Sequence, residues 1–111
     1  MAKLRPIDAL EATIHDRRAN PSEKSYTSQL LSGGIERIGS KVLEEAAELV
    51  EAAGEPAEAG NQHAIYEAGD LLYHMLVLLA ARGVELAEVE SELARRFGMS
   101  GLAEKASRHQ G

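Results

Sequence analysis

The chain of 111 residues contains no cysteine, no tryptophan and only one phenylalanine. The absence of cysteine excludes disulfide bonds, thiolate metal ligands and thiol catalysis. Aromatic and β-branched residues are few beside Ala, Leu and Glu, and this balance favours helix over strand. The formal net charge of −6 argues against binding of nucleic acid through its phosphates.

Long uncharged segments are also absent. Residues 1–18 carry charges in every turn and contain no apolar core of a signal peptide. The most apolar run, LLYHMLVLLAA at 71–81, has 11 residues, which is too short to span a bilayer. We therefore expect a cytoplasmic protein without membrane contact, and a single domain over residues 1–111.

Pro, Gly and Asn residues divide the chain into helical segments. The predicted helices cover residues 6–19, 26–31, 35–53, 61–82 and 84–97. Asn61 is the expected N-cap of the fourth helix, and Gly83 is expected to end it. No segment alternates as a strand does, so we expect an all-α fold, a helical bundle around a central antiparallel hairpin. The tail from about residue 98 is expected to form one short helix or to be mobile.

Two polar stripes mark the hairpin. At about 100° per residue, the third predicted helix has one charged stripe beside its apolar face, made of Arg37, Lys41, Glu44, Glu45 and Glu48. The fourth predicted helix is otherwise apolar and has a narrow stripe of His63, Glu67, Asp70 and His74. Residues three apart on a helix are neighbours, so Glu45 reaches the same point as Glu48, and Glu67 the same point as Asp70.

Folding of the hairpin brings these pairs to one height. The expected linker, 54–60, is centred on residue 57. The midpoint of Glu45 and Glu48 lies about 10.5 residues before this centre, and that of Glu67 and Asp70 about 11.5 residues after it. At about 1.5 Å per residue the heights differ by only about 1.5 Å. Four carboxylates this close repel each other unless a cation lies among them or some are protonated.

Oxygen ligands alone suit Mg²⁺ or Mn²⁺ better than zinc. The di-iron sites of helical bundles use Glu-x-x-His, and no histidine here has Glu three residues before it. His74 is better interpreted as a hydrogen-bonded core residue, and His63 as solvent-exposed. A divalent cation beside Arg37 and Lys41 is typical of sites for polyphosphates, and Glu44 or Glu45 is placed to take a proton from an attacking water.

The same segments resemble a known family. KVLEEAAE at 41–48 and EAGD at 67–70 resemble the ExxE…ExxD signature of the all-α, MazG-like nucleotide pyrophosphohydrolases. KSYTSQLL at 24–31, EAGDLLYHMLVLL at 67–79 and GLAEKASR at 101–108 are similar to the phosphoribosyl-ATP pyrophosphohydrolases. This resemblance implies the second step of histidine biosynthesis, in which phosphoribosyl-ATP is hydrolysed to phosphoribosyl-AMP and pyrophosphate.

The resemblance also implies roles for individual residues. It implies Mg²⁺ bound by Glu45, Glu48, Glu67 and Asp70, with Glu44 adjoining. Contacts to phosphate or ribose are implied for Lys24, Tyr26, Lys41, Lys105 and Arg108. Together with the extent of apolar surface on the fourth predicted helix, it points to a homodimer.

Two other functions fit parts of the sequence. A house-cleaning nucleoside-triphosphate pyrophosphohydrolase would use the same metal chemistry and differ only in its contacts to base and ribose. A helical interaction module without enzymatic activity would carry the acidic residues for solubility alone. Release of pyrophosphate that depends on Mg²⁺ would separate the enzymes from the module.

Overall fold

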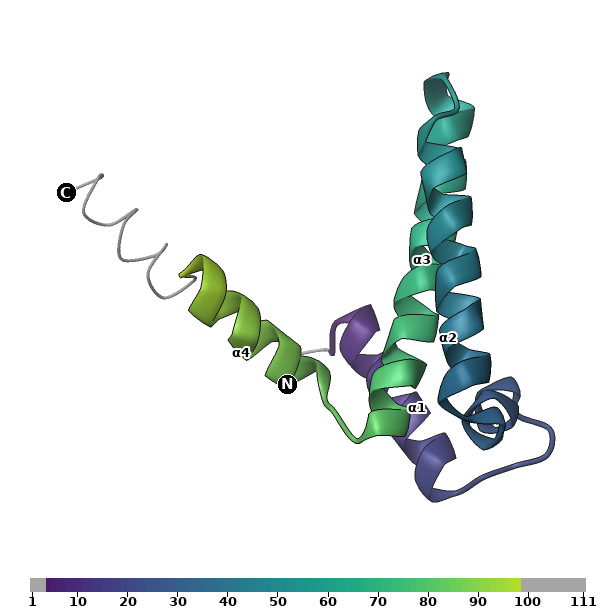
Figure 1. The fold of residues 1–111 in the computed structure, drawn as a ribbon, viewed down its shortest axis with the longest axis vertical. Coiled ribbons are helices and arrows are strands. Elements are labelled where there is room, and N and C mark those ends of the chain that lie inside the picture. The colour runs from purple at the N-terminus through teal and green to yellow at the C-terminus, as the bar shows by residue number, and fades with distance from the viewer. Residues whose placement is uncertain (1–3, 99–111) are drawn as a thin grey trace.

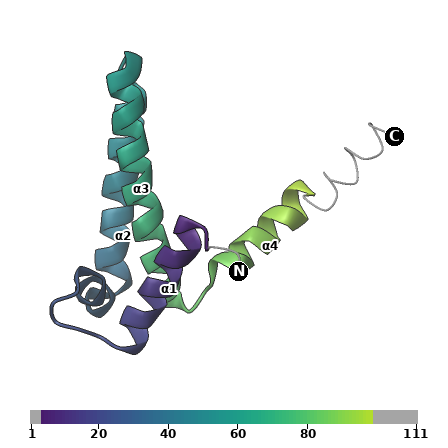
Figure 2. The same ribbon diagram turned by 180° about the vertical axis from the view of Figure 1, so that it is seen from behind.

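The computed structural model describes residues 4–98, which form four helices and no strand. The helices are α1 (Pro6–Ala19), α2 (Tyr26–Ala53), α3 (Ala57–Arg82) and α4 (Leu86–Phe97). Helices α2 and α3 form a long antiparallel hairpin, α1 packs across one end of it, and α4 projects away (Figure 1, and from behind in Figure 2). The prediction of an all-α fold is confirmed.

The core lies where α1 meets the hairpin. Its buried members come from three helices and are Ile14, Leu30, Ile38, Leu76, Val77 and Ala80. Helix α1 has the predicted bounds: Pro6 stands in its first turn, where proline has the required φ and no needed donor is lost. Arg17 and Arg18 occupy the last turn, where cations are favourable beside the negative end of the helix dipole.

The predicted break between two helical segments within 26–53 is confirmed: α2 is continuous in its bounds but consists of two helical parts that meet at a kink at Gly34. Gly34 has φ 82° and ψ 179°, outside the helical region, and only glycine adopts this conformation readily. The turns before Gly34 therefore point in a different direction from the rest of α2 (Figure 1). Ser25 caps the helix start through its side chain, which accepts a hydrogen bond from the Ser28 amide at 3.1 Å.

Helix α3 begins at Ala57, four residues before the predicted Asn61, so that prediction is wrong. Pro56 is the N-cap residue, and its extended backbone precedes three good helix formers, Ala57, Glu58 and Ala59. The first turn of α3 forms the bend of the hairpin: a Cβ added to Gly60 would lie 2.2 Å from the Glu55 carbonyl oxygen. The carboxylates of Glu45, Glu67 and Asp70 nevertheless come together across the hairpin. The predicted end at Gly83 is confirmed by its left-handed φ of 78°.

By length and composition, α3 is the one described helix that could cross a membrane. Core helices of globular proteins meet the same criteria. Because α3 packs along α2 and buries Glu67 against it, its composition is weak evidence for a membrane span.

Helix α4 begins at Leu86 and not at the predicted Val84. Glu85 and Glu88 form a reciprocal capping box at its start. The carboxylate of Glu11 on α1 also accepts a hydrogen bond from the Leu86 amide at 2.7 Å. These contacts place the start of α4 two residues after Val84, the start predicted from the position of Gly83.

Candidate metal centre

Three carboxylates converge between the arms of the hairpin. Glu45 comes from α2, and Glu67 and Asp70 come from α3. One oxygen atom from each lies within 4.8 Å of the others. Glu45 and Glu67 are only 6% and 5% exposed, and Asp70 is partly buried. The sequence predicts this convergence, because the spacing of Glu67 and Asp70 places both on the face that α3 turns towards α2.

Two of the carboxylate oxygens are buried without a hydrogen-bond partner among the described residues. They are Oε2 of Glu45 and Oε2 of Glu67. Buried polar atoms are nearly always paired, and an unpaired buried carboxylate is costly. A divalent cation would compensate both, and an all-oxygen set of ligands fits Mg²⁺ or Mn²⁺. The residues present therefore fit a hard divalent cation.

Glu48 lies beside these three carboxylates, outside the group whose oxygens are within 4.8 Å of one another. Hydrogen bonding with Glu48, followed by burial, raises the pKa of Glu67 to about 7, and the charges of Glu45 and Asp70 add to this rise. Burial raises the pKa of Glu45, and Glu48 and Asp70 raise it further, whereas His74 lowers it. The structure thus brings together three of the four carboxylates predicted to bind the metal and places Glu48 next to them, whereas its role as a ligand stays a prediction. Their mutual repulsion is what a cation would relieve.

The predicted cations and the adjoining Glu44 lie on the more exposed side of α2. Lys41 Nζ lies 3.3 Å from Glu44 Oε2, and this hydrogen bond is the main cause of a raised pKa for Lys41. Arg37 is exposed and packs its side chain over Gly33, where a Cβ would lie 2.4 Å from Arg37 Cδ. Lys24 is exposed as well.

Two of the predicted substrate contacts, Lys105 and Arg108, lie outside the described residues, as does nearly all of the predicted tail. Their predicted roles stay predictions.

Both histidines of the polar stripe on α3 lie where the sequence predicts. His63 is exposed, and its Nδ1 lies 2.9 Å from Glu55 Oε2. His74 is 5% exposed and hydrogen-bonded, as expected of a core histidine. Sequence reasoning does not find Thr27 and Tyr73, whose hydroxyl groups bond to each other beside His74. In the sequence, only the position of each polar hydroxyl group on an otherwise apolar helix face could have indicated these two residues.

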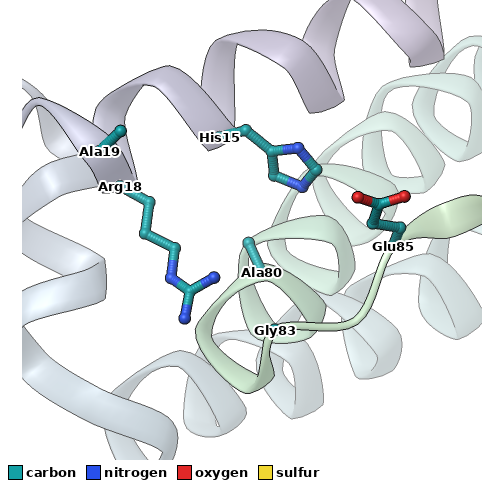
Figure 3. Close-up of a pocket in the computed structure, with 6 residues that line it drawn as sticks. All are labelled: His15, Arg18, Ala19, Ala80, Gly83 and Glu85. Carbon is teal, nitrogen blue, oxygen red and sulfur yellow. The ribbon is translucent and has the colours of Figure 1, made fainter.

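The carboxylate cluster is separate from two open hollows on the described part of the chain. A cavity of about 290 Å³ lies between α1 and the C-terminal end of α3, where His15, Arg18 and Glu85 line it (Figure 3). Glu67 and Asp70 lie in the middle of α3, so this cavity is separate from them. A second hollow of about 400 Å³ includes Lys24 at the start of α2.

An all-α hairpin with an ExxE…ExxD cluster of carboxylates defines a class of protein with an acidic site for a divalent cation. The family model described as phosphoribosyl-ATP pyrophosphohydrolase matches residues 7–97. The chain therefore belongs to the phosphoribosyl-ATP pyrophosphohydrolase family.

Several curated relatives are similar over nearly the whole chain. The phosphoribosyl-ATP pyrophosphatase of Rhodopirellula baltica is 63% identical over 105 residues, which cover 95% of this chain and 88% of the relative. Phosphoribosyl-ATP pyrophosphatase 1 of Rhodopseudomonas palustris is 52% identical over 99 residues, covering 89% and 90%. The phosphoribosyl-ATP pyrophosphatase of Geotalea daltonii is 47% identical over 102 residues, covering 92% and 93%.

Proposed function

We propose that this protein hydrolyses phosphoribosyl-ATP to phosphoribosyl-AMP and pyrophosphate, the second step of histidine biosynthesis. The observation that carries the proposal is the family match over residues 7–97, a range that includes the whole carboxylate cluster. Relatives that share about half or more of their residues with this chain carry the same activity in their names. We place the reaction in the cytoplasm.

The cofactor in this proposal is Mg²⁺, with Mn²⁺ as a substitute. Glu45, Glu48, Glu67 and Asp70 hold the cation, and the two unpaired buried oxygens of Glu45 and Glu67 support this assignment. When bound, the cation neutralises phosphoryl oxygens and the charge that develops on the leaving pyrophosphate. The fit of hard oxygen ligands to this cation is the physical basis of the choice.

The chain supplies the remaining chemistry through charge and proton transfer. Glu45 has a raised pKa because it is buried among other carboxylates, which suits a group that accepts a proton. Glu44 adjoins the cluster and is an alternative base, although it is exposed and bonded to Lys41. The proposed contacts to phosphate and ribose are Lys24, Tyr26, Arg37, Lys41, Lys105 and Arg108.

We also propose that the protein is a homodimer. Four large apolar side chains on the hairpin are mostly exposed: Leu43 at 74%, Val50 at 73%, Ile65 at 66% and Tyr66 at 67%. Leu43 and Val50 are seven residues apart and so share one face of α2. A second copy of the hairpin would cover these residues, and two-fold dimers are the commonest solution for such surfaces.

Pyrophosphate release from phosphoribosyl-ATP, measured beside a panel of deoxynucleoside triphosphates with and without Mg²⁺, tests the proposal. We expect the highest kcat/KM on phosphoribosyl-ATP, with cleavage between the α and β phosphates, and no turnover in EDTA. A higher kcat/KM on a canonical or modified deoxynucleotide would identify a house-cleaning enzyme instead. Absence of turnover on every substrate with Mg²⁺ would favour the interaction module.

A further inference from the structure

A hydrogen-bonded pair of side chains, Tyr26 and His74, lies beside the carboxylate cluster. Tyr26 stands in the first turn of α2, and its hydroxyl oxygen lies 3.3 Å from Nε2 of His74 on α3. The other ring nitrogen of His74, Nδ1, lies 2.9 Å from the backbone carbonyl oxygen of Asp70. His74 is buried, whereas Tyr26 remains 45% exposed. The pair therefore connects solvent-exposed surface to the backbone of a carboxylate in the cluster.

The chemistry of the two contacts fixes the direction of both hydrogen bonds. A carbonyl oxygen only accepts, so Nδ1 of His74 must donate its hydrogen to Asp70. In a neutral imidazole the other nitrogen then carries no hydrogen and can only accept. The Tyr26 hydroxyl must therefore donate its single hydrogen to Nε2 of His74.

This direction determines what Tyr26 offers to a ligand. Once its hydrogen is directed to His74, the hydroxyl oxygen of Tyr26 has only lone pairs left, and it acts as an acceptor. Phosphate oxygens at neutral pH are acceptors as well, so they make poor partners for this oxygen. A hydroxyl group of ribose or an amino group of the base is a donor and is a suitable partner.

The surrounding contacts hold the Tyr26 ring in place. It stacks against Tyr73 with ring centres 6.3 Å apart and an angle of 26° between the planes. Tyr73 is itself tied to α2 by the hydrogen bond with Thr27, and it packs edge-on against His74 at 4.9 Å. Tyr26 and Lys41 both belong to α2, and Tyr26 contributes to the raised pKa of Lys41 after Glu44.

We propose that Tyr26 accepts a hydrogen bond from a hydroxyl or amino group of the nucleotide substrate, and that His74 is the positioning residue that keeps Tyr26 an acceptor. The inference rests on the proposed function, and it assigns to Tyr26 the sugar or the base and not a phosphate. It also gives the buried histidine a role beyond filling the core.

The tautomer of His74 is tested without any substrate. In ¹⁵N NMR spectra of the full-length, metal-free protein, we expect one imidazole with Nδ1 protonated and Nε2 unprotonated, assigned by its loss in His74→Asn. Tyr26→Phe should leave Nδ1 protonated and shift the Nε2 resonance, because Nε2 loses its donor. Protonation of His74 at Nε2 in the wild-type protein would overturn the proposal.

Substrate analogues test the partner of Tyr26. Phosphoribosyl-ATP is compared with analogues that each lack one ribose hydroxyl or the exocyclic nitrogen of the base, with wild-type protein and with Tyr26→Phe. We expect Tyr26→Phe to lower kcat/KM on the full substrate by roughly 3- to 10-fold, the value of one neutral hydrogen bond. One analogue should show the same loss with wild-type protein and no further loss with Tyr26→Phe, and that analogue identifies the donor.

An equal loss on every analogue would overturn the proposal, because it would mean that Tyr26 contacts a phosphate or has only a structural role. Absence of turnover by wild-type protein on phosphoribosyl-ATP would instead contradict the proposed function, so the two failures are distinguishable.

A matched pair of variants tests the role of His74. Glutamine places an amide near the position of Nε2 and can still accept from Tyr26, whereas asparagine places its amide near Nδ1 and cannot. With His74→Gln, we expect kcat/KM to remain lower on the analogue that lacks the donor to Tyr26 than on the full substrate. With His74→Asn, we expect this difference in kcat/KM to disappear, at a similar melting temperature. If both variants fold and both lose this difference in kcat/KM, the positioning role of His74 is contradicted. If neither variant folds, the comparison of wild type with Tyr26→Phe still decides the proposal.

Discussion

Glu45 and Glu67 approach each other from facing helices, and each buries its Oε2 atom without a hydrogen-bond partner among the described residues. Two unpaired buried carboxylate oxygens are an unfavourable arrangement for a folded protein in the absence of metal. The arrangement becomes favourable when a cation binds between them. Repulsion between these carboxylates thus lowers the free energy of unfolding of the metal-free protein. Binding of the cation should raise this free energy again.

Substitution of Glu67 tests this relationship directly. Glu67→Gln keeps the shape of the side chain and removes one negative charge. Mg²⁺ at about 100 times its Kd should stabilise wild-type protein by about 2.7 kcal/mol, because it binds the folded state only. We expect Glu67→Gln to melt no lower than wild type in EDTA, to gain less from Mg²⁺ and to lose most of its hydrolytic activity. Thermal melting with and without Mg²⁺ measures both effects.

Glu92 provides the matched control. Its carboxylate bonds to Arg95 at 2.6 Å and to Arg96 at 3.2 Å on the surface of α4, and these partners lower its pKa. Glu92→Gln should change the melting temperature little, as expected for a surface ion pair, and should leave the response to Mg²⁺ unchanged. If metal-free Glu67→Gln melts well below wild type while its activity persists, the carboxylates are not a metal site.

The pH dependence of stability follows from the raised pKa of Glu67, about 7 against an ordinary value of 4.5. The carboxyl group of Glu67 therefore binds a proton more tightly in the folded state than in the unfolded chain. The stability it contributes is therefore fully present below about pH 4.5 and is lost as pH rises through about 7. In EDTA, the melting temperature of wild type should fall relative to that of Glu67→Gln between about pH 5 and pH 8.

Saturating Mg²⁺ should reverse this trend, because the cation competes with protons for the same oxygens. A difference between the two proteins that stays constant from about pH 5 to pH 8 would show that Glu67 titrates near its ordinary pKa.

The ends of helices were predictable where local chemistry decides them. Pro6 and Gly83 marked helix ends correctly, because the fixed φ of proline and the left-handed conformation of glycine act within one turn of chain. Asn61 did not, because α3 starts at a bend where Gly60 packs against the backbone of Glu55. The contact of Gly60 with Glu55 depends on the geometry of the turn between α2 and α3, and the pattern of residue types does not predict that geometry.

The positions of the carboxylates were predictable because helix geometry is regular and a hairpin has one centre. The pair of Tyr26 and His74 was not, since it depends on the direction of the turns of α2 that precede the bend at Gly34. The apolar face of α2 was also identified correctly from the sequence, but the exposure of part of that face was not predicted. Leu43 and Val50 are more than 70% exposed in the single chain, and periodicity alone does not distinguish a core from an interface.

The exposure of Leu43 gives a test of the proposed dimer. Leu43→Lys places a charge on the apolar face of the hairpin while leaving the core of a single chain unchanged. We expect wild type to sediment as a dimer at micromolar concentration and Leu43→Lys to dissociate at least partly to monomer. Thr13→Lys introduces the same charge at an exposed polar position of α1, outside the hairpin, and should remain dimeric. Sedimentation of wild type as a monomer would contradict the dimer.

The bend of the hairpin gives the last prediction, a comparison of two glycines on α3. At Gly60 an added Cβ would lie 2.2 Å from the Glu55 carbonyl oxygen, which is backbone and cannot move aside without shifting the bend. Gly60→Ala should therefore lower the free energy of unfolding by about 1–3 kcal/mol, as overpacking does. At Gly69 an added Cβ meets nothing within 4 Å, so Gly69→Ala should raise it by about 0.5–1 kcal/mol through helix propensity.

The two substitutions add the same methyl group to the same helix, so the sign of each effect reports the local geometry. Urea unfolding at one fixed protein concentration measures both. Because the bend sets the height of α3 against α2, Gly60→Ala should also weaken the stabilisation by Mg²⁺, whereas Gly69→Ala should leave it intact. Equal stabilisation by both substitutions would mean that the first turn of α3 does not pack against Glu55, and that the bend does not determine how the carboxylates meet.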